Sequence, residues 1–179
     1  MQQDPQEFGK LFMAKVEECC GTRKNFIADL FRGDQQYVTQ CCACRARSTR
    51  DANFDELEVA IAGQSNVQDC VKSYLQNEYL EGDNQYFCDA CGGKRDATRC
   101  VVIKKAPKVL SVQLLRYVYD RVTWEKKKLR DGIETNATIE VTEDGREVPY
   151  DLVAIVRRRG RASRGSPRLL VVECLITHV

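Results

Sequence analysis

The sequence predicts an α+β domain, because helical and strand-like periodicities follow one another in mixed order and no internal repeat is visible. A capped amphipathic segment opens the chain, and a second helical pattern lies in its middle. From position 101 onward, apolar residues mostly alternate with polar ones, as they do in half-buried strands. The chain has 179 residues, of which 43% are hydrophobic and 30% charged, so it can form one domain with its own core.

The first predicted helix begins at Asp4. This residue can cap the helix, Pro5 suits the first helical position, and Glu7 completes a capping box. An apolar stripe is expected to face a core and consists of Phe8, Leu11, Phe12 and Val16. The helix is expected to stop at Gly21, because glycine is typical just beyond a helix C-terminus.

The middle of the chain predicts short strands around one further helix. Val38 and the alternating series Leu57, Val59 and Ile61 indicate strands. Helical spacing follows Asn66, in Val67, Val71, Tyr74 and Leu75, and the turn cluster at 81–84 predicts the end of that helix.

The second half of the chain predicts mainly strands. Their alternating apolar residues are Leu110, Val112 and Leu114, then Ile139 and Val141, then Leu152, Ala154 and Val156. The pairs Asp131-Gly132 and Asp144-Gly145 are typical of two-residue hairpin turns, so we expect the strands that flank them to be antiparallel neighbours.

Composition restricts the partners and the compartment. With 28 basic and 26 acidic residues the chain lacks the overall positive field of a nucleic-acid-binding protein, so no nucleic-acid partner is expected. No apolar run approaches the ~18 residues of a membrane span, so no membrane partner is expected either. The polar, acidic start does not resemble a secretory signal. We therefore expect a soluble monomer in a reducing compartment, the cytoplasm or the nucleus.

The strongest chemical signal is a pair of C-x-x-C motifs. Cys41 and Cys44 form the first and Cys88 and Cys91 the second, with 43 residues between them. Two such knuckles supply the four thiolates of a tetrahedral zinc shell, which would be closed and therefore structural. Because the separation is long, each knuckle is expected to cap its own hairpin. Gly92 and Gly93 would permit positive φ after the last ligand.

Two other interpretations of these cysteines stay open. One is buried free thiols, and the other is a redox disulfide, although neither pair lies in a βαβ pattern. The chain has ten cysteines in all. Cys42 lies between two ligands and is the residue most easily mistaken for one. Four further cysteines are interpreted as small hydrophobic residues: Cys19, Cys20, Cys70 and Cys100.

An ordered series of motifs also carries a family resemblance. The chain opens with Met-Gln-Gln-Asp-Pro-Gln-Glu-Phe at 1–8, and further motifs follow at 31–33, 41–48, 54–57, 78–91, 96–99, 107–110, 114–120 and 126–128. In this order they resemble the motifs of the ubiquitin-specific proteases, a family of cysteine deubiquitinases. The resemblance covers about 1–156 and is nearest to the branch named ubiquitin-specific protease 48.

This resemblance implies a fold, a partner and binding residues. The fold would be part of a papain-like hand, with a thumb helix region at 1–32, zinc-bearing fingers at 33–108 and antiparallel palm strands at 109–156. The partners would be ubiquitin and ubiquitinated proteins. By match to the family's motifs, Gln2, Asp4 and Tyr117 would bind the basic C-terminal tail of ubiquitin. Asp4 would then have two competing uses, as a helix cap and as a tail contact.

The chain departs from the family where the catalytic residues are expected. None of its cysteines lies in the family's nucleophile box, so no catalytic residue is assigned. The strand at 150–156 matches the family, but then six arginines fall within 157–168, and Cys174 stands where the family places its general base. His178, the single histidine, matches a later non-catalytic histidine of the family and is expected to end a strand.

Three interpretations of the arginine-rich stretch remain open: a solvated loop, a basic tag for nucleic acid or nuclear import, and a splice or gene-model anomaly. Residues 157–179 are therefore predicted to form a divergent Arg-rich loop and a terminal strand. We expect a fragment or isoform of a thiol-dependent deubiquitinase without its own nucleophile and base. The alternative is a non-catalytic, zinc-stabilised module that binds ubiquitin.

Overall fold

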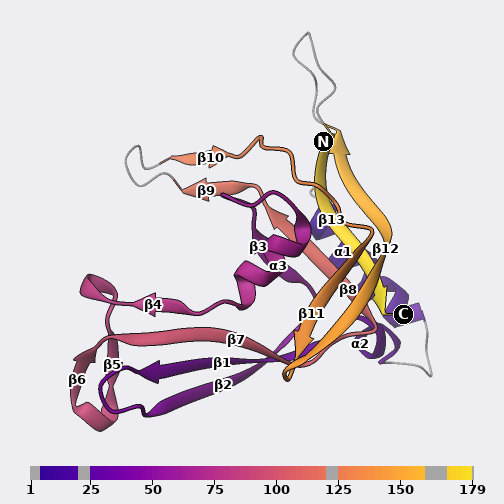
Figure 1. Cartoon of the computed structure of the whole chain (residues 1–179). Helices are drawn as coiled ribbons and strands as arrows, with labels where there is room; N and C mark the ends of the chain where they lie inside the picture. Colours follow the sequence, from indigo (N-terminus) through magenta and orange to yellow (C-terminus); the bar gives the residue numbers. More distant parts are fainter. Residues whose placement is uncertain (1–4, 20–24, 120–124, 160–168, 179) are drawn as a thin grey trace.

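The computed structural model describes residues 5–19, 25–119, 125–159 and 169–178, and Figure 1 shows the arrangement of the elements. Within these ranges the helices are α1 (Pro5–Cys19), α2 (Phe26–Phe31) and α3 (Val67–Leu75), with short 3₁₀ helices η1 (Gly82–Asn84) and η2 (Asp89–Cys91). The strands are β1 (Gly33–Cys41), β2 (Arg47–Phe54), β3 (Leu57–Ala60), β4 (Glu78–Leu80), β5 (Tyr86–Cys88), β6 (Gly93–Arg95), β7 (Ala97–Lys105), β8 (Val109–Leu115), β9 (Tyr117–Tyr119), β10 (Lys126–Lys128), β11 (Thr138–Glu143), β12 (Arg146–Arg159) and β13 (Leu169–His178). The predicted α+β class is confirmed.

One large sheet forms the frame of the molecule. Its order is β2-β1-β7-β11-β12-β13-β8-β3. In addition, β4 pairs with the first residues of β7. Neighbouring strands are antiparallel except for the pairs β3–β8 and β7–β11. Separate hairpins are formed by β5 with β6 and by β9 with β10. In Figure 1 the ribbon formed by β1, β2 and β7 extends away from the helices, and β5 and β6 lie at its far end. The sheet therefore contains both the predicted finger strands and the predicted palm strands.

The two predicted hairpin turns have different outcomes. Asp144 and Gly145 connect β11 to β12, with φ of 45° and 85°, and Glu143 pairs with Arg146 across them. Two successive left-handed residues are typical of a type I′ turn, so this prediction is confirmed. The turn predicted at Asp131-Gly132 is wrong, because these residues lie in an irregular segment between β10 and β11.

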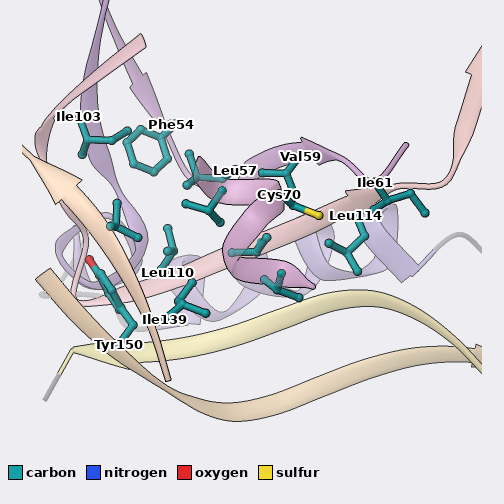
Figure 2. Packing of buried hydrophobic residues seen from close by; sticks show 14 of the residues in the cluster. Phe54, Leu57, Val59, Ile61, Cys70, Ile103, Leu110, Leu114, Ile139 and Tyr150 are labelled. Atoms are coloured by element: carbon teal, nitrogen blue, oxygen red, sulfur yellow. The ribbon is translucent and has the colours of Figure 1, made fainter. Parts of the chain in front are cut away.

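The core lies between α3 and the sheet. Helix α3 starts at its predicted position, where the side chain of Asn66 accepts a hydrogen bond from the backbone N–H of Asp69 at 2.9 Å. From α3 the buried residues are Val67, Cys70 and Val71, and from the strands they include Leu57, Val59, Leu110, Val112, Ile139, Val141 and Tyr150. Figure 2 shows side chains of this cluster between the helix and the strands, among them Cys70, Leu110 and Ile139.

Helix α3 ends earlier than predicted. Its last residue is Leu75, not a residue of the turn cluster at 81–84, and Gln76 is already extended. The chain then forms β4, whose Leu80 pairs with Ala97 of β7 and is buried. The backbone groups of 78–80 therefore find partners on a strand distant in sequence, which outweighs their local helical preference.

The apolar stripe of α1 is only partly as predicted. The helix starts at Pro5 as expected, but Leu11 is 66% exposed and Phe12 is 54% exposed, so the expectation that both face a core is wrong. Among the described residues, α1 is held by contacts with α2 and by an ion pair from Lys10 to Glu56 at 2.8 Å. No helix within the described ranges is long and apolar enough to cross a membrane.

The C-terminal strand lies inside the sheet and not at its edge. Strand β13 pairs with β12 on one side and with β8 on the other. His178 ends the strand, as predicted. Residues 157–159 were expected in an arginine-rich loop, but they belong to β12 and pair with β13, so that part of the prediction is wrong. The rest of the loop, 160–168, lies outside the described residues, and the predicted region boundaries stay predictions.

Candidate metal centre and ubiquitin-tail residues

The first cysteine knuckle is the turn between β1 and β2. Cys41 is the last residue of β1, and its backbone N–H donates to the carbonyl of Ala46 at 3.0 Å. The backbone N–H of Arg45 donates back to the carbonyl of Cys41 at 3.0 Å. Arg45 has a φ of 64°, a left-handed conformation that is uncommon for a residue with a side chain. This turn holds Cys41 and Cys44 on one knuckle.

The second knuckle repeats this device between β5 and β6. Cys88 ends β5, η2 carries the chain to Cys91, and Gly92 follows with a φ of 64°. The N–H of Gly92 donates to the carbonyl of Asp89 at 3.2 Å. The predicted positive φ is thus confirmed at Gly92 but is wrong for Gly93. As predicted, each knuckle caps its own hairpin.

The pairing of β1 with β7 brings the two knuckles together. Cys41 lies opposite Ala97, the first residue of β7. Only Asp96 separates β7 from the end of β6. In addition, the backbone N–H of Cys42 donates to the carbonyl of Asp96 at 2.8 Å, and the side chain of Gln85 donates to the carboxylate of Asp96 at 2.8 Å. Asp96 therefore connects the loop of the first knuckle to the hairpin of the second.

The four predicted ligands lie close enough together to hold one zinc ion. The sulfur atoms of Cys41, Cys44, Cys88 and Cys91 all lie within 4.8 Å of one another. Cys41 Sγ is 4.0 Å from Cys91 Sγ, and Cys44 Sγ is 3.6 Å from Cys88 Sγ. A tetrahedron with zinc–sulfur bonds of about 2.3 Å has sulfur–sulfur edges of about 3.8 Å. The two shorter distances are close to such an edge, so the four sulfur atoms are placed to form a tetrahedral Cys₄ shell.

The thiols perturb one another strongly. The backbone N–H of Cys44 lowers the pKa of Cys41 to about 7, whereas interaction with the Cys44 side chain, together with burial, raises the pKa of Cys91 to about 12. Neighbouring thiols can share protons, but four neighbouring thiolates would repel one another. A divalent cation among the sulfur atoms would stabilise all four in the thiolate form.

The remaining described cysteines lie outside this cluster. Cys42 is exposed and is not part of it, as the sequence analysis expected. Cys70 lies on the buried face of α3 and Cys100 is half-buried, which agrees with their interpretation as small hydrophobic residues. For Cys19 this interpretation is wrong, because the residue is exposed. Cys20 lies outside the described residues.

Of the three residues predicted to bind the ubiquitin tail, the structure describes only Tyr117. Gln2 and Asp4 lie outside the described residues. Tyr117 begins β9 and is 59% exposed, and Lys128 Nζ of β10 lies 5.5 Å from the centre of its ring. An exposed ring on a short hairpin is accessible to a partner. The lysine contact was not predicted, although the pairing of Tyr117 with Lys128 in adjacent strands accounts for it.

A buried arginine holds this hairpin in place and was also missed by sequence reasoning. Arg116 is 7% exposed, and its Nη1 donates to the carbonyl of Asp131 at 2.9 Å. The N–H of Leu129 donates to the carbonyl of Arg116 at 2.7 Å. Arg116 therefore binds the segment that follows β10 and fixes the base of the β9–β10 hairpin. A buried arginine immediately before an exposed aromatic residue gives no periodic signal in the sequence.

The described residues do not bring together a nucleophile and a base. The single histidine of the sequence, His178, lies at the end of β13, where its backbone pairs with Tyr150. Cys174 lies in the middle of β13, opposite Ile155 on one side and Val112 on the other. A thiol mechanism needs a cysteine activated by an adjacent base. As in the sequence analysis, no residue is assigned a catalytic role.

Comparison with known proteins identifies the family. A family model described as ubiquitin carboxyl-terminal hydrolase matches residues 1–166. The chain belongs to the ubiquitin carboxyl-terminal hydrolase family. Ubiquitin carboxyl-terminal hydrolase 48 of Danio rerio is 38% identical over 168 residues, which cover 89% of this chain and 16% of that protein. Ubiquitin carboxyl-terminal hydrolase 26 of Arabidopsis thaliana is 32% identical over 174 residues, covering 90% of this chain and 16% of that protein. The predicted branch is confirmed.

Solved structures support the fold assignment. The structure of the SAGA Ubp8/Sgf11/Sus1/Sgf73 DUB module bound to ubiquitin aldehyde aligns with a TM-score of 0.76 at 20% identity. The alignment covers 99% of this chain and 50% of that chain. At this identity the likeness shows the fold, which is part of the ubiquitin-specific protease hand. The chain spans about half of the solved chain and 16% of the length of the curated relatives.

Proposed function

We propose that this chain forms the zinc-stabilised fingers and part of the palm of a cysteine deubiquitinase, and that it binds ubiquitin. In the complete protein this part would hold ubiquitin while a cysteine thiolate hydrolyses the isopeptide bond after the last ubiquitin residue. The observation that carries the proposal is the convergence of four cysteines from two hairpins, in a chain that belongs to this family.

The zinc ion is proposed to be structural. Cys41, Cys44, Cys88 and Cys91 would hold it, and four protein ligands would leave no open position for water or substrate. Bound zinc would fasten the β5–β6 hairpin to the turn between β1 and β2, at the far end of the long strands. Because thiolate ligands persist only where cysteines stay reduced, we propose the cytoplasm or the nucleus as the compartment.

Ubiquitin is the proposed partner. The solved structure described above is bound to ubiquitin aldehyde. By their resemblance to the family's motifs, Gln2, Asp4 and Tyr117 of this chain would contact the ubiquitin tail. The exposed ring of Tyr117 supports its part of this proposal, since a buried ring could not contact a partner. The remaining contacts would come from the fingers and the palm, with the protein acting as a monomer.

The nucleophile and the base are proposed to come from residues outside this sequence. The sequence has one histidine, and that residue ends a strand instead of standing at the family's base position. The test is to incubate the 179-residue chain with ubiquitin that carries an electrophile at its C-terminus, and to do the same with the full-length gene product. We expect a covalent adduct only with the full-length product. An adduct with the 179-residue chain would show that one of its ten cysteines is the nucleophile.

A second candidate is a non-catalytic module that binds ubiquitin. It is favoured by the position of Cys174, which stands where the family has its base. The two candidates differ in the full-length product: a module would bind ubiquitin but never form the adduct, and it would not cleave a diubiquitin substrate. A deubiquitinase would form the adduct and would also cleave diubiquitin.

A further inference from the structure

Strand β2 forms one edge of the large sheet, and its outer side pairs with no strand of the described ranges. In Figure 1 it is the lower border of the ribbon that it forms with β1 and β7. It has eight residues, whereas β3 at the opposite end of the sheet has four. Its pairing with β1 shows no bulge, and it contains no proline. A long, regular edge of this kind is a template for another strand.

The register with β1 shows which backbone groups of β2 face outward. The N–H of Cys41 donates to the carbonyl of Ala46 at 3.0 Å, which makes Gln40 and Arg47 a non-hydrogen-bonded pair. The two kinds of pair alternate along an antiparallel ladder. The residues that bond to β1 are therefore Ser48, Arg50 and Ala52. The residues whose N–H and C=O groups point to the free edge are Arg47, Thr49, Asp51 and Asn53.

The charged side chains of β2 lie on both faces of the sheet. Arg50 lies over the Tyr37 ring, with its guanidinium carbon 4.8 Å from the ring centre. Arg47 and Asp51 belong to the opposite face, because side chains alternate along a strand. The side chain of Arg47 is exposed and makes no ion pair or hydrogen bond with the described part of the chain. Asp51 Oδ1 accepts from Gln36 Nε2 at 2.7 Å, so Oδ2 of the same carboxylate can accept from a further donor.

These charges are self-complementary in one register. A second copy of β2 can pair antiparallel with the first about a twofold axis perpendicular to the sheet, which sets residues of the same face opposite each other. With the axis at Arg50 two arginines would lie opposite each other, and with the axis at Asp51 two aspartates would, which is unfavourable in both cases. With the axis at Thr49, Arg47 of each copy lies opposite Asp51 of the other.

The same register also satisfies the backbone. The directly opposed residues are then Thr49 with Thr49, and Arg47 with Asp51. All of them turn their N–H and C=O groups to the free edge, so each pair can exchange two backbone hydrogen bonds. Registers that lack this charge match would form the ladder without the opposite-charge pairs at its two ends.

We propose that β2 is a dimerisation edge, which pairs with β2 of a second copy of this chain in the register centred on Thr49. Each Arg47–Asp51 pair would form a charge-assisted hydrogen bond between the copies. The self-complementary order of charges favours a second copy over a strand of another protein. The contact goes beyond the proposed function and leaves it unchanged, because Tyr117 belongs to a separate two-stranded sheet and each copy would bind ubiquitin by itself.

Sedimentation velocity of the zinc-loaded chain, from micromolar to millimolar concentration, tests the proposal. We expect an equilibrium of monomer and dimer without larger species, because a twofold contact closes with two copies. Amide hydrogen exchange should slow with concentration at Thr49 and Asp51, and should not change at Ser48, whose N–H bonds to β1. A chain that stays monomeric throughout, or one that forms larger species, would overturn the proposal.

Two charge reversals test the register. Arg47→Asp and Asp51→Arg should each weaken the dimer about tenfold or more, because both cross-strand pairs change from attraction to repulsion. An equal mixture of the two variants should associate again, as a heterodimer, since every acidic residue then lies opposite a basic one.

The matched control is Arg50→Asp. It changes the net charge as much as Arg47→Asp does, but in this register Arg50 lies opposite the uncharged Ser48 of the other copy, so the dimer should be unaffected. An equal loss in the control would mean that only the overall charge of β2 matters, and it would contradict the register. A dimer that survives both reversals would contradict it too, and would point to association through the exposed Leu11 and Phe12 of α1.

Discussion

Each cysteine knuckle contains one residue in a left-handed conformation, Arg45 in the first and Gly92 in the second. A substitution at Gly92 tests whether this conformation is needed. Gly92 has a φ of 64°, and a Cβ added there would meet no atom within 4 Å. Gly92→Ala should therefore destabilise the protein through backbone strain alone, by about 1 kcal/mol. Urea unfolding of the zinc-loaded chain measures this loss.

The matched control for this substitution is Gly132→Ala. Gly132 also has open space around its Cα, but its φ is not in the left-handed region. The free energy of unfolding should stay unchanged or rise slightly, since alanine reduces the entropy of the unfolded chain. If both substitutions cost the same, the strain at Gly92 is not what limits this turn.

The half-buried Tyr74 predicts how stability responds to alkaline pH. Burial raises the pKa of Tyr74 to about 12, whereas an unfolded tyrosine has a pKa of about 10. The unfolded state therefore loses its proton first as the pH rises. The contribution of Tyr74 to stability is complete below about pH 10 and is lost as the pH rises to about 12.

Tyr74→Phe should make this alkaline loss shallower, because phenylalanine has no proton to lose. The measurement is the free energy of unfolding as a function of pH, from urea titrations between about pH 9 and 12. Tyr79→Phe serves as the control, since Tyr79 is 70% exposed and should leave the slope as it is. Equal slopes in wild type and Tyr74→Phe would show that Tyr74 does not resist deprotonation.

At the scale of elements, we expect zinc to join the two cysteine-bearing hairpins of the fingers. The described strands of the β5–β6 hairpin pair only with each other, so the cysteine cluster and the contacts of Asp96 connect them to β1 and β2. We expect zinc removal to lower the melting temperature, because zinc binding by a Cys₄ site is coupled to folding. Calorimetric melting before and after dialysis against a chelator measures the effect.

Cys44→Ser and Cys42→Ser separate loss of the metal from loss of packing. Both cysteines are exposed, so neither substitution opens a cavity in the core. Cys44→Ser should already melt at the low temperature of the chelated protein and should not respond to chelator. Cys42→Ser should behave like wild type. A wild-type protein that melts at the same temperature after complete metal removal would contradict the zinc assignment.

The sequence predicted those elements whose signals are local. The start of α3 followed from the cap at Asn66 and the helical spacing after it, and the β11–β12 turn followed from Asp144-Gly145. The end of α3 did not, because β4 pairs with a strand distant in sequence. The exposure of Leu11 and Phe12 was also missed, since an amphipathic pattern shows that a helix has an apolar face but not what covers it.

Other contacts of the elements leave no sequence pattern at all. Gln68 of α3 donates to the carbonyl of Glu140 at 2.9 Å and accepts from the N–H of Glu140 at 2.6 Å. Its side-chain amide thus takes the place of a neighbouring strand along β11, which meets β7 only at Glu143. From the sequence alone, this glutamine cannot be distinguished from an ordinary surface residue of a helix.

At the scale of the whole molecule, the family and the metal cluster could be predicted from the sequence, but the position of the last strand could not. The two C-x-x-C pairs and the order of the motifs identify the fingers and the palm before any coordinate is known. By contrast, the family motifs recognised in the sequence end at Val156 and the matching family model ends at residue 166, whereas β13 completes the sheet between β12 and β8. Pairing across a sheet is non-local, and a strand placed by its neighbours can differ in sequence.

The central claim is that this chain is a zinc-stabilised, ubiquitin-binding part of a deubiquitinase. Calorimetric titration of ubiquitin into the zinc-loaded chain tests it most directly. We expect saturable binding that Tyr117→Ala weakens. Absence of binding by a chain that is folded and contains zinc would contradict the claim.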